Sequence, residues 1–400
     1  MKAFPALIII LIISVFTAGC KNETNKEEKL KTFDLKTFPE VTTVKLSDLG
    51  FKNIEYIPLE TNDSSLIDGN YSPIGGYKIL SADGFFIIKH YTTILKFRDD
   101  GSFDRKIGTM GRGPNEFLVC HDIETDERGQ IYTADAWKEM FFKYSGDGEL
   151  VSTFKSPLVR KAVEFSYSDG KFLCYNQNNL ADIVNSFNVI DTNGILLKSF
   201  PNKYPFTRHP ASAFGFNHEV LFYKFNNRIF SKEVYCDTIF AFDNMCFTPH
   251  IVIEAGDKLI TPEIMSKTEG LYIIKKYINP FNLFEFGNYV YYEVQTEFIL
   301  YKGSKVNAFI GSKKDDFKAF IDSEKGLIND LDGGPAILPI TTKDDNTVIA
   351  MVEAMELKNY IASDTFKNSD PKFPDKKKQL EAMAGNIKET DNPILILVSM

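Results

Sequence analysis

A short strand that recurs beside tight turns is the feature of this sequence that most constrains its fold. The strand-like runs are rich in Val, Ile, Phe and Tyr, and turn-forming residues bound them. They lie at residues 85–89, 130–133, 171–175, 219–225, 288–294 and 347–352. Repetition of this kind predicts an all-β domain built from similar units.

A second repeated element sets the size of the unit. An apolar residue, three turn-forming residues and a glycine recur so that Gly101, Gly148 and Gly194 are 47 and 46 residues apart. Asp-Gly and Asn-Gly pairs adopt positive φ at little cost, as tight hairpins require. About four short strands in a period near 46 residues fit one blade of a β-propeller. The sequence therefore predicts a six-bladed β-propeller of four-stranded antiparallel blades from residue 40 to residue 400.

Such a ring has to be closed by joining its two ends. The apolar run at residues 393–398 is predicted to complete a blade with residues 54–59. Two segments, 261–277 and 375–389, are predicted to be short helical insertions, because Thr261-Pro262 forms a helix start and the second segment has high helix propensity. Residues 366–375 are predicted to be a loop.

The N-terminus has the layout of a secretory signal peptide. Lys2 precedes an apolar run from residue 3 to 18, and small residues stand directly before Cys20. A cysteine at this place resembles the lipobox of bacterial lipoproteins, although Thr17 stands where leucine is usual. The interpretation is a signal peptide at residues 1–19, then a lipidated Cys20 and a flexible tether over residues 20–39. A plain signal peptide or a membrane anchor remain alternatives, but the run is shorter than the ~20 residues of a spanning helix.

The net charge limits the classes of partner that the exported chain is expected to bind. Removal of residues 1–19 takes away only Lys2, which leaves 45 basic and 54 acidic side chains and a net charge of −9. This balance argues against nucleic acid as a partner. The expected partner is the membrane, through the lipid on Cys20. Because Lys21 rather than Asp follows this cysteine, the expected location is the outer membrane, on either its periplasmic face or the cell surface.

The four other cysteines predict no metal or redox motif. Cys120, Cys174, Cys236 and Cys246 show no C-x-x-C spacing, and three disulfide pairings stay open. Cys236 and Cys246 could bridge a hairpin. Cys174 is expected to pack as a small apolar residue.

Part of the chain resembles a known blade type. Residues 107–117, 129–135 and 142–148 together are similar to a blade of the NHL type. With the lipobox-like start and the strand at 393–398, the whole chain resembles the six-bladed β-propeller lipoproteins of Bacteroidota. That resemblance covers about residues 40–400 and implies a fold and an envelope location, but no activity. The glycines at 108, 111 and 113 do not form a phosphate loop, because Pro114 follows them and no Lys-Ser or Lys-Thr does.

Loops predicted to share one face of the ring carry the candidate binding residues. Blade-to-blade connections and the loops after second strands are expected to emerge together. A rim of amides, charges and one tryptophan suits stacking on a sugar or binding of a peptide. The candidates are His90, Tyr91, Arg112, Asn115, Glu116, Asp135, Trp137, Lys138, Asn176 and Asn178. The alternative is a solvated polar rim, with Trp137 covering a neighbouring blade.

Catalytic signals are weak. The sequence has no G-x-S-x-G elbow, no metal-binding histidine spacing and no recognisable carboxylate pair, so neither a metal nor another cofactor is predicted. His121-Asp122 is a marginal candidate for channel-facing chemistry and otherwise an ordinary strand pair. The favoured interpretation is a lipid-anchored binding module for a glycan, a peptide or an envelope protein. A metal-dependent hydrolase or lyase that uses the propeller channel is the alternative.

Overall fold

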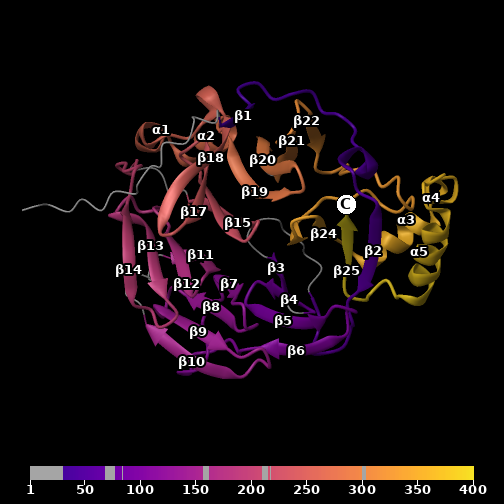
Figure 1. Cartoon of the computed structure of the whole chain (residues 1–400), viewed down its shortest axis with the longest axis horizontal. Coiled ribbons are helices and arrows are strands. Elements are labelled where there is room, and N and C mark those ends of the chain that lie inside the picture. The colour runs from indigo at the N-terminus through magenta and orange to yellow at the C-terminus, as the bar shows by residue number, and fades with distance from the viewer. Residues whose placement is uncertain are drawn as a thin grey trace, which may run out of the picture.

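Six antiparallel sheets form a ring around a central axis in the described part of the chain (Figure 1). The computed structural model describes residues 30–67, 77–82, 84–155, 162–209, 215–216, 218–299 and 303–400. Cys20 and the predicted signal peptide at residues 1–19 lie outside these residues. The prediction of a six-bladed β-propeller with four-stranded blades is confirmed.

Each blade is a meander whose first strand lies innermost, and the strands are numbered along the chain. Blades 1 and 2 contain β3 (Tyr77–Ala82), β4 (Phe85–His90), β5 (Thr93–Arg98), β6 (Phe103–Ile107), β7 (Asp122–Thr125), β8 (Ile131–Asp135), β9 (Met140–Tyr144) and β10 (Leu150–Lys155). Blades 3 and 4 contain β11 (Ala162–Ser168), β12 (Lys171–Asn176), β13 (Asn185–Asp191), β14 (Leu196–Pro201), β15 (Val220–Phe225), β16 (Arg228–Glu233), β17 (Thr238–Asp243) and β18 (Cys246–Glu254). Blades 5 and 6 contain β19 (Asn279–Phe286), β20 (Tyr289–Ile299), β21 (Gly303–Ser312), β22 (Lys318–Asp322), β23 (Thr341–Asp344), β24 (Thr347–Val352), β25 (Ile394–Ser399) and β2 (Asn53–Pro58).

The two faces of the ring differ in their connections. The crossover face carries the blade-to-blade connections and the loops between second and third strands. The hairpin face carries the other, tighter turns. Gly101, Gly148 and Gly194 lie in hairpin-face turns with φ of 87°, 76° and 84°, as their Asp-Gly and Asn-Gly pairs predict.

Blade 6 closes the ring from both ends of the chain. β25 pairs with β24 on one side and with β2 on the other, so the outermost strand of this blade comes from the N-terminal region. The register joins Ile54 to Val398 and Ile57 to Leu395. The predicted pairing of residues 393–398 with residues 54–59 is therefore confirmed.

An N-terminal strap runs along the outside of blades 4, 5 and 6. β1 (Lys31–Asp34) pairs in parallel with β18 as a fifth strand of blade 4. The chain then contacts blade 5, where the Thr42 amide donates to the Phe320 carbonyl at 2.7 Å, and continues into β2. The segment predicted as a tether thus includes a strand, because residues 31–34 extend an open sheet edge.

The hydrophobic core forms layers between neighbouring blades. Phe86, Leu95 and Leu397 belong to the layer between blades 1 and 6, and similar layers separate the other blades. The largest layer joins blades 4 to 6, the strap and the C-terminal helices. Because each blade buries both faces only against its neighbours, the blades depend on one another for stability.

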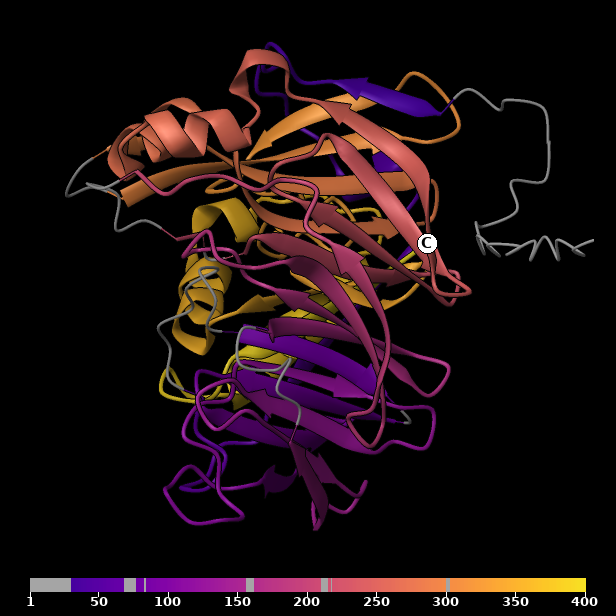
Figure 2. The same ribbon diagram turned by 90° about the vertical axis from the view of Figure 1, so that its left-hand side faces the viewer.

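Helices decorate the crossover face (Figure 2). α1 (Pro262–Lys267) and α2 (Gly270–Lys276) connect blades 4 and 5, within the predicted helical segment 261–277. α3 (Ala354–Ala362), α4 (Asp364–Lys367) and α5 (Pro374–Asn386) are inserted between β24 and β25. The helix at 375–389 is confirmed as α5. α4 takes the first two residues of the predicted 366–375 loop and α5 takes the last two, and the sequence does not predict α3. No helix in the described ranges is long and apolar enough to span a membrane.

Shortening a closing side chain should destabilise the whole ring. Leu395 is fully buried in β25, so Leu395→Ala should lower the free energy of unfolding by about 2–5 kcal/mol. The exposed Leu196 on the outer strand of blade 3 provides a control, because Leu196→Ala should cost less than ~1 kcal/mol. Chemical denaturation followed by circular dichroism measures both. Equal losses of unfolding free energy in the two variants would contradict the conclusion that the stability of the ring depends on its closure.

Candidate functional site

The long connection between blades 1 and 2 is held in shape by its own side chains. The Glu116 carboxylate accepts a hydrogen bond from the Gly113 amide at 2.7 Å, and a Cβ on Gly111 would lie 2.0 Å from this carboxylate. The Lys138 ammonium donates to the carbonyls of Gly113, at 2.7 Å, and Glu116. Glu116 and Lys138, both predicted rim residues, therefore build the loop on which the exposed side chains stand.

Asp135 connects two neighbouring loops from a fully buried position. Its carboxylate accepts from the Leu118 amide at 2.6 Å, and from the Trp137 and Lys138 amides at 2.9 Å and 3.1 Å. A carboxylate that binds several amides is held in one place and cannot reach a ligand on the rim. Asp135 thus positions Trp137 rather than forming part of the exposed surface.

Four of the predicted rim residues are exposed on the crossover face. Arg112 and Asn115 are exposed in the blade 1–2 connection, and Trp137 and Tyr91 follow the second strands of blades 2 and 1. Trp137 is 74% exposed and Tyr91 50% exposed. Trp137 therefore does not cover a neighbouring blade, which was the alternative interpretation.

The remaining predicted residues are buried beneath the rim. The Asn176 side-chain amide donates to the Asn185 carbonyl at 2.8 Å, and the Asn178 side-chain oxygen accepts from the Ile183 amide at 3.4 Å. His90 stacks on Tyr77 at 4.5 Å between ring centroids and contacts Tyr91 at 4.6 Å. These three side chains support the loops from inside.

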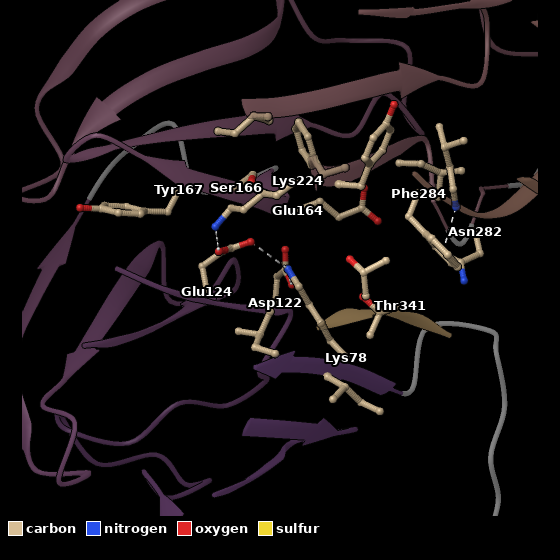
Figure 3. A pocket seen from close by; sticks show the side chains of 18 of the residues that line it. Lys78, Asp122, Glu124, Glu164, Ser166, Tyr167, Lys224, Asn282, Phe284 and Thr341 are labelled. Carbon is tan, nitrogen blue, oxygen red and sulfur yellow. Dashed lines mark hydrogen bonds and ion pairs between the residues drawn. The ribbon is translucent and has the colours of Figure 1, made fainter. Parts of the chain in front are cut away.

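A cavity of about 1220 Å³ occupies the middle of the ring. Side chains from the first strands of all six blades line it, from Tyr77 and His121 at the crossover face to Asp169 and Asp345 at the hairpin face. Figure 3 shows charged side chains from blades 1 to 4 opposite Asn282, Phe284 and Thr341 of blades 5 and 6. Charged residues of blades 5 and 6 line the channel as well, namely Glu293, Lys343, Asp344 and Asp345.

Ion pairs across the channel join three blades. The Lys78 ammonium lies 2.8 Å from the Asp122 carboxylate and 3.6 Å from that of Glu124, and Lys224 binds Glu124 at 2.7 Å. Burial would lower the pKa of Lys78, but the Asp122 and Glu124 carboxylates outweigh burial and raise it. Lys78 and Lys224 are thus paired with the channel's own carboxylates.

A histidine and a glutamate form a second pair in the channel wall. The Nδ1 atom of His218 lies 2.5 Å from the Glu164 carboxylate. Burial raises the pKa of Glu164. Burial alone would lower the pKa of His218, but the Glu164 carboxylate outweighs this effect and raises it. Each group favours the charged form of the other across the boundary between blades 3 and 4.

Sequence reasoning missed most of the channel residues. It named His121 and Asp122 as marginal candidates, and both line the cavity. It did not name Lys78, Glu124, Glu164, His218 or Lys224. The available signal was the alternation of polar residues along the first strands, as in Asp122 and Glu124, since alternate side chains of a strand point to one face.

The cysteines do not form the pair considered from sequence. Cys236 is a free thiol, so the proposed Cys236–Cys246 hairpin bridge is wrong. Cys120 and Cys174 are buried free thiols, and Cys174 packs among aromatic side chains between blades 2 and 3, as predicted. Within the described ranges, no group of three or more His, Cys, Asp or Glu side chains could hold a metal ion.

Residues 30–399 match the family described as Domain of unknown function, DUF4934. The chain belongs to the DUF4934 family. The match covers every blade and the strap, so the family is defined by the complete ring.

Solved structures share the ring of this DUF4934 chain. One is a protein of Bacteroides fragilis assigned as exported, with 16% sequence identity, a TM-score of 0.65, and coverage of 92% of this chain and 99% of that chain. Another is a DUF4221 family member from Bacteroides vulgatus, with 11% identity, a TM-score of 0.51, and coverage of 87% and 96%. At these identities the likeness shows the fold alone.

A more distant structure adds no functional information. Virginiamycin B lyase from Staphylococcus aureus has 10% identity and a TM-score of 0.39, with coverage of 87% of this chain and 99% of that chain. A similarity of that size supports no inference about activity. No protein of curated function matches the sequence.

Buried carboxyl groups should make this propeller more stable in mild acid. Burial raises the pKa of Glu219 and of Glu293 to about 7. Below pH 7 the folded protein therefore keeps protons on these carboxyl groups that the unfolded chain has already released. The stability that this proton binding contributes is present at low pH and is lost as the pH rises through about 7. The melting temperature should fall between pH 5 and pH 8, as differential scanning calorimetry can measure.

A single substitution tests the origin of this pH dependence. Glu293→Gln removes one titrating group and should flatten the profile, since each unit of pKa shift corresponds to about 1.4 kcal/mol. Glu381→Gln, at an exposed position on α5, should leave the profile unchanged. A wild-type protein that is more stable at pH 8 than at pH 5 would contradict the assignment.

Proposed function

We propose that this protein is a lipid-anchored binding module of the cell envelope. Its ligand, a glycan, a peptide or a protein partner, is engaged at the crossover face, where the central channel meets the exposed rim. The observation that carries the proposal is the combination of a large channel that contains charged groups with exposed Tyr91 and Trp137 in loops of the crossover face. Solvent-exposed aromatic side chains next to a cavity with polar groups are typical of ligand sites.

An aromatic stack connects the channel to the rim. Tyr77 lines the cavity, His90 stacks on Tyr77, and Tyr91 contacts His90 and is half exposed. A ligand in the channel can therefore extend outward to Tyr91 and contact the rings of this stack along its whole length. Trp137, held by Asp135 in the next blade, offers a second flat surface on the same face.

The course of the strap supports an orientation at the membrane. β1 runs parallel to β18, which leads from the hairpin face to the crossover face, so the N-terminal end of β1 lies at the hairpin face. A lipid on Cys20 would be about ten residues away, a reach of at most ~36 Å. The hairpin face would then be directed toward the membrane, and the binding face away from it.

The aromatic rim provides the test of the binding role. Oligosaccharides and short peptides are screened for a rise in melting temperature of residues 30–400, since a ligand specific for the folded state must stabilise it. Trp137→Ala and Tyr91→Ala should each weaken binding of a positive compound about 5–50-fold by calorimetry, because each removes a stacking surface.

A third exposed aromatic residue serves as the control. Tyr272 is 63% exposed on α2, at the connection between blades 4 and 5, and Tyr272→Ala should leave affinity within about twofold. If no compound shifts the melting temperature and no envelope protein is captured by the wild type, the binding role is wrong. Equal losses in all three variants would contradict a localised rim site.

Lipid anchoring is tested separately in cells. Cys20→Ala removes the acceptor of the lipid, so the protein should move from the membrane fraction to the soluble fraction and lose incorporation of labelled fatty acid. Cys236→Ala alters a free thiol in the loop between β16 and β17, and this variant should remain in the membrane fraction. Membrane retention of the Cys20→Ala variant would show that the lipid assignment is wrong.

A further inference from the structure

Lys89 is a largely buried lysine of the channel wall that forms no ion pair among the described residues. It lies in β4, directly opposite Lys78 of β3, and is only 5% exposed. It lines the cavity, yet its ammonium group forms no hydrogen bond or ion pair with any described residue. Lys78 and Lys224, by contrast, are bound by Asp122 and Glu124.

Two carboxylates that line the same cavity are already engaged. Asp122 binds the Lys78 ammonium and accepts the Phe165 amide at 3.0 Å, and Glu164 binds His218. Burying an ammonium group without a counter-charge is costly, so such groups in proteins are normally paired. Among the described lining residues, Lys89 is therefore a largely buried lysine that forms no ion pair with these carboxylates.

A second nitrogen donor lines the same cavity as Lys89. His218 uses Nδ1 for Glu164, and its other ring nitrogen, Nε2, makes no hydrogen bond within the described ranges. Both side chains line the same cavity.

We propose that Lys89 binds a carboxylate group of the channel ligand, with His218 Nε2 as a second donor. The proposal rests on the binding role proposed above and specifies the chemistry of the ligand. A carboxylate supplies the missing counter-charge, and its two oxygens can accept one hydrogen bond from each donor.

The charge of the channel favours a single carboxylate over a more highly charged anion. Among the described lining residues, nine Asp and Glu side chains face five Lys and Arg side chains. A phosphate dianion would meet stronger repulsion from this acidic wall than a carboxylate, whose single negative charge matches the single positive charge of Lys89. A peptide C-terminus and an acidic sugar share the required group.

The experiment compares ligands that differ only in the carboxylate. Binding to residues 30–400 is measured by NMR titration for acetyl-alanyl-alanine against its C-terminal amide, and for glucuronic acid against glucose. We expect at least tenfold tighter binding of an acid than of its neutral partner. Preference for the peptide acid or the sugar acid identifies the source of the group. The proposal is overturned if an acid and its neutral partner bind with equal affinity. It is also overturned if neither acid binds at concentrations up to 10 mM, which corresponds to a binding free energy of about −2.7 kcal/mol.

Lys89→Met tests the same inference on the protein. It should reduce affinity for the preferred acid at least tenfold and raise the melting temperature of the unliganded protein by about 2 °C or more, because an unpaired buried charge is removed. The exposed Lys343, at the hairpin-face end of the cavity, is the matched control, and Lys343→Met should change neither quantity. A lower melting temperature for Lys89→Met would show that Lys89 has a structural partner and would overturn the proposal.

The two proposals fail in different ways. If the Trp137 and Tyr91 variants lose binding while the Lys89→Met variant keeps the wild-type affinity, the rim site is supported and the carboxylate site is overturned. Acid binding that depends on Lys89 but not on the aromatic rim would support the carboxylate site and overturn the rim.

Discussion

The pairing of β2 with β25 is the interaction on which the rest of the structure depends. Each blade has two apolar faces, and only a neighbour on each side removes both from water. An open row of six blades would leave two such faces exposed. By using strands from both ends of the chain in one sheet, blade 6 turns a row of local meanders into one cooperative unit, and the channel exists only because that unit is closed.

The charges of the channel are part of this architecture. Lys78, Glu124 and Lys224 come from blades 1, 2 and 4, so their ion pairs form only when the first strands converge on the axis. The same convergence places an acidic residue beside His218 and leaves Lys89 without one. The channel thus combines groups that fix the blades relative to one another with a lysine that forms no ion pair among the described residues.

The sequence predicts the parts of this fold that depend on local interactions. Asp-Gly and Asn-Gly turns, β-branched strands and the closing strand at residues 393–398 follow from short-range chemistry. The channel pairs do not, because Glu164 and His218 are 54 residues apart and meet only in the closed ring. The rim was identified by loop position, but Asp135 and Asn178 use their polar groups on neighbouring backbone, which composition does not reveal.

The parallel pairing of β1 with β18 has a mechanical consequence. The N-terminal end of β1 points out of the hairpin face, so a pull on the preceding chain acts along the strand axis. The hydrogen bonds that link Lys31–Asp34 to blade 4 are then loaded together in shear and are not unzipped one by one. Force that reaches the body through its N-terminus is borne first by this outer edge and then by the strap across blade 5, which shields the β2–β25 seam from direct tension.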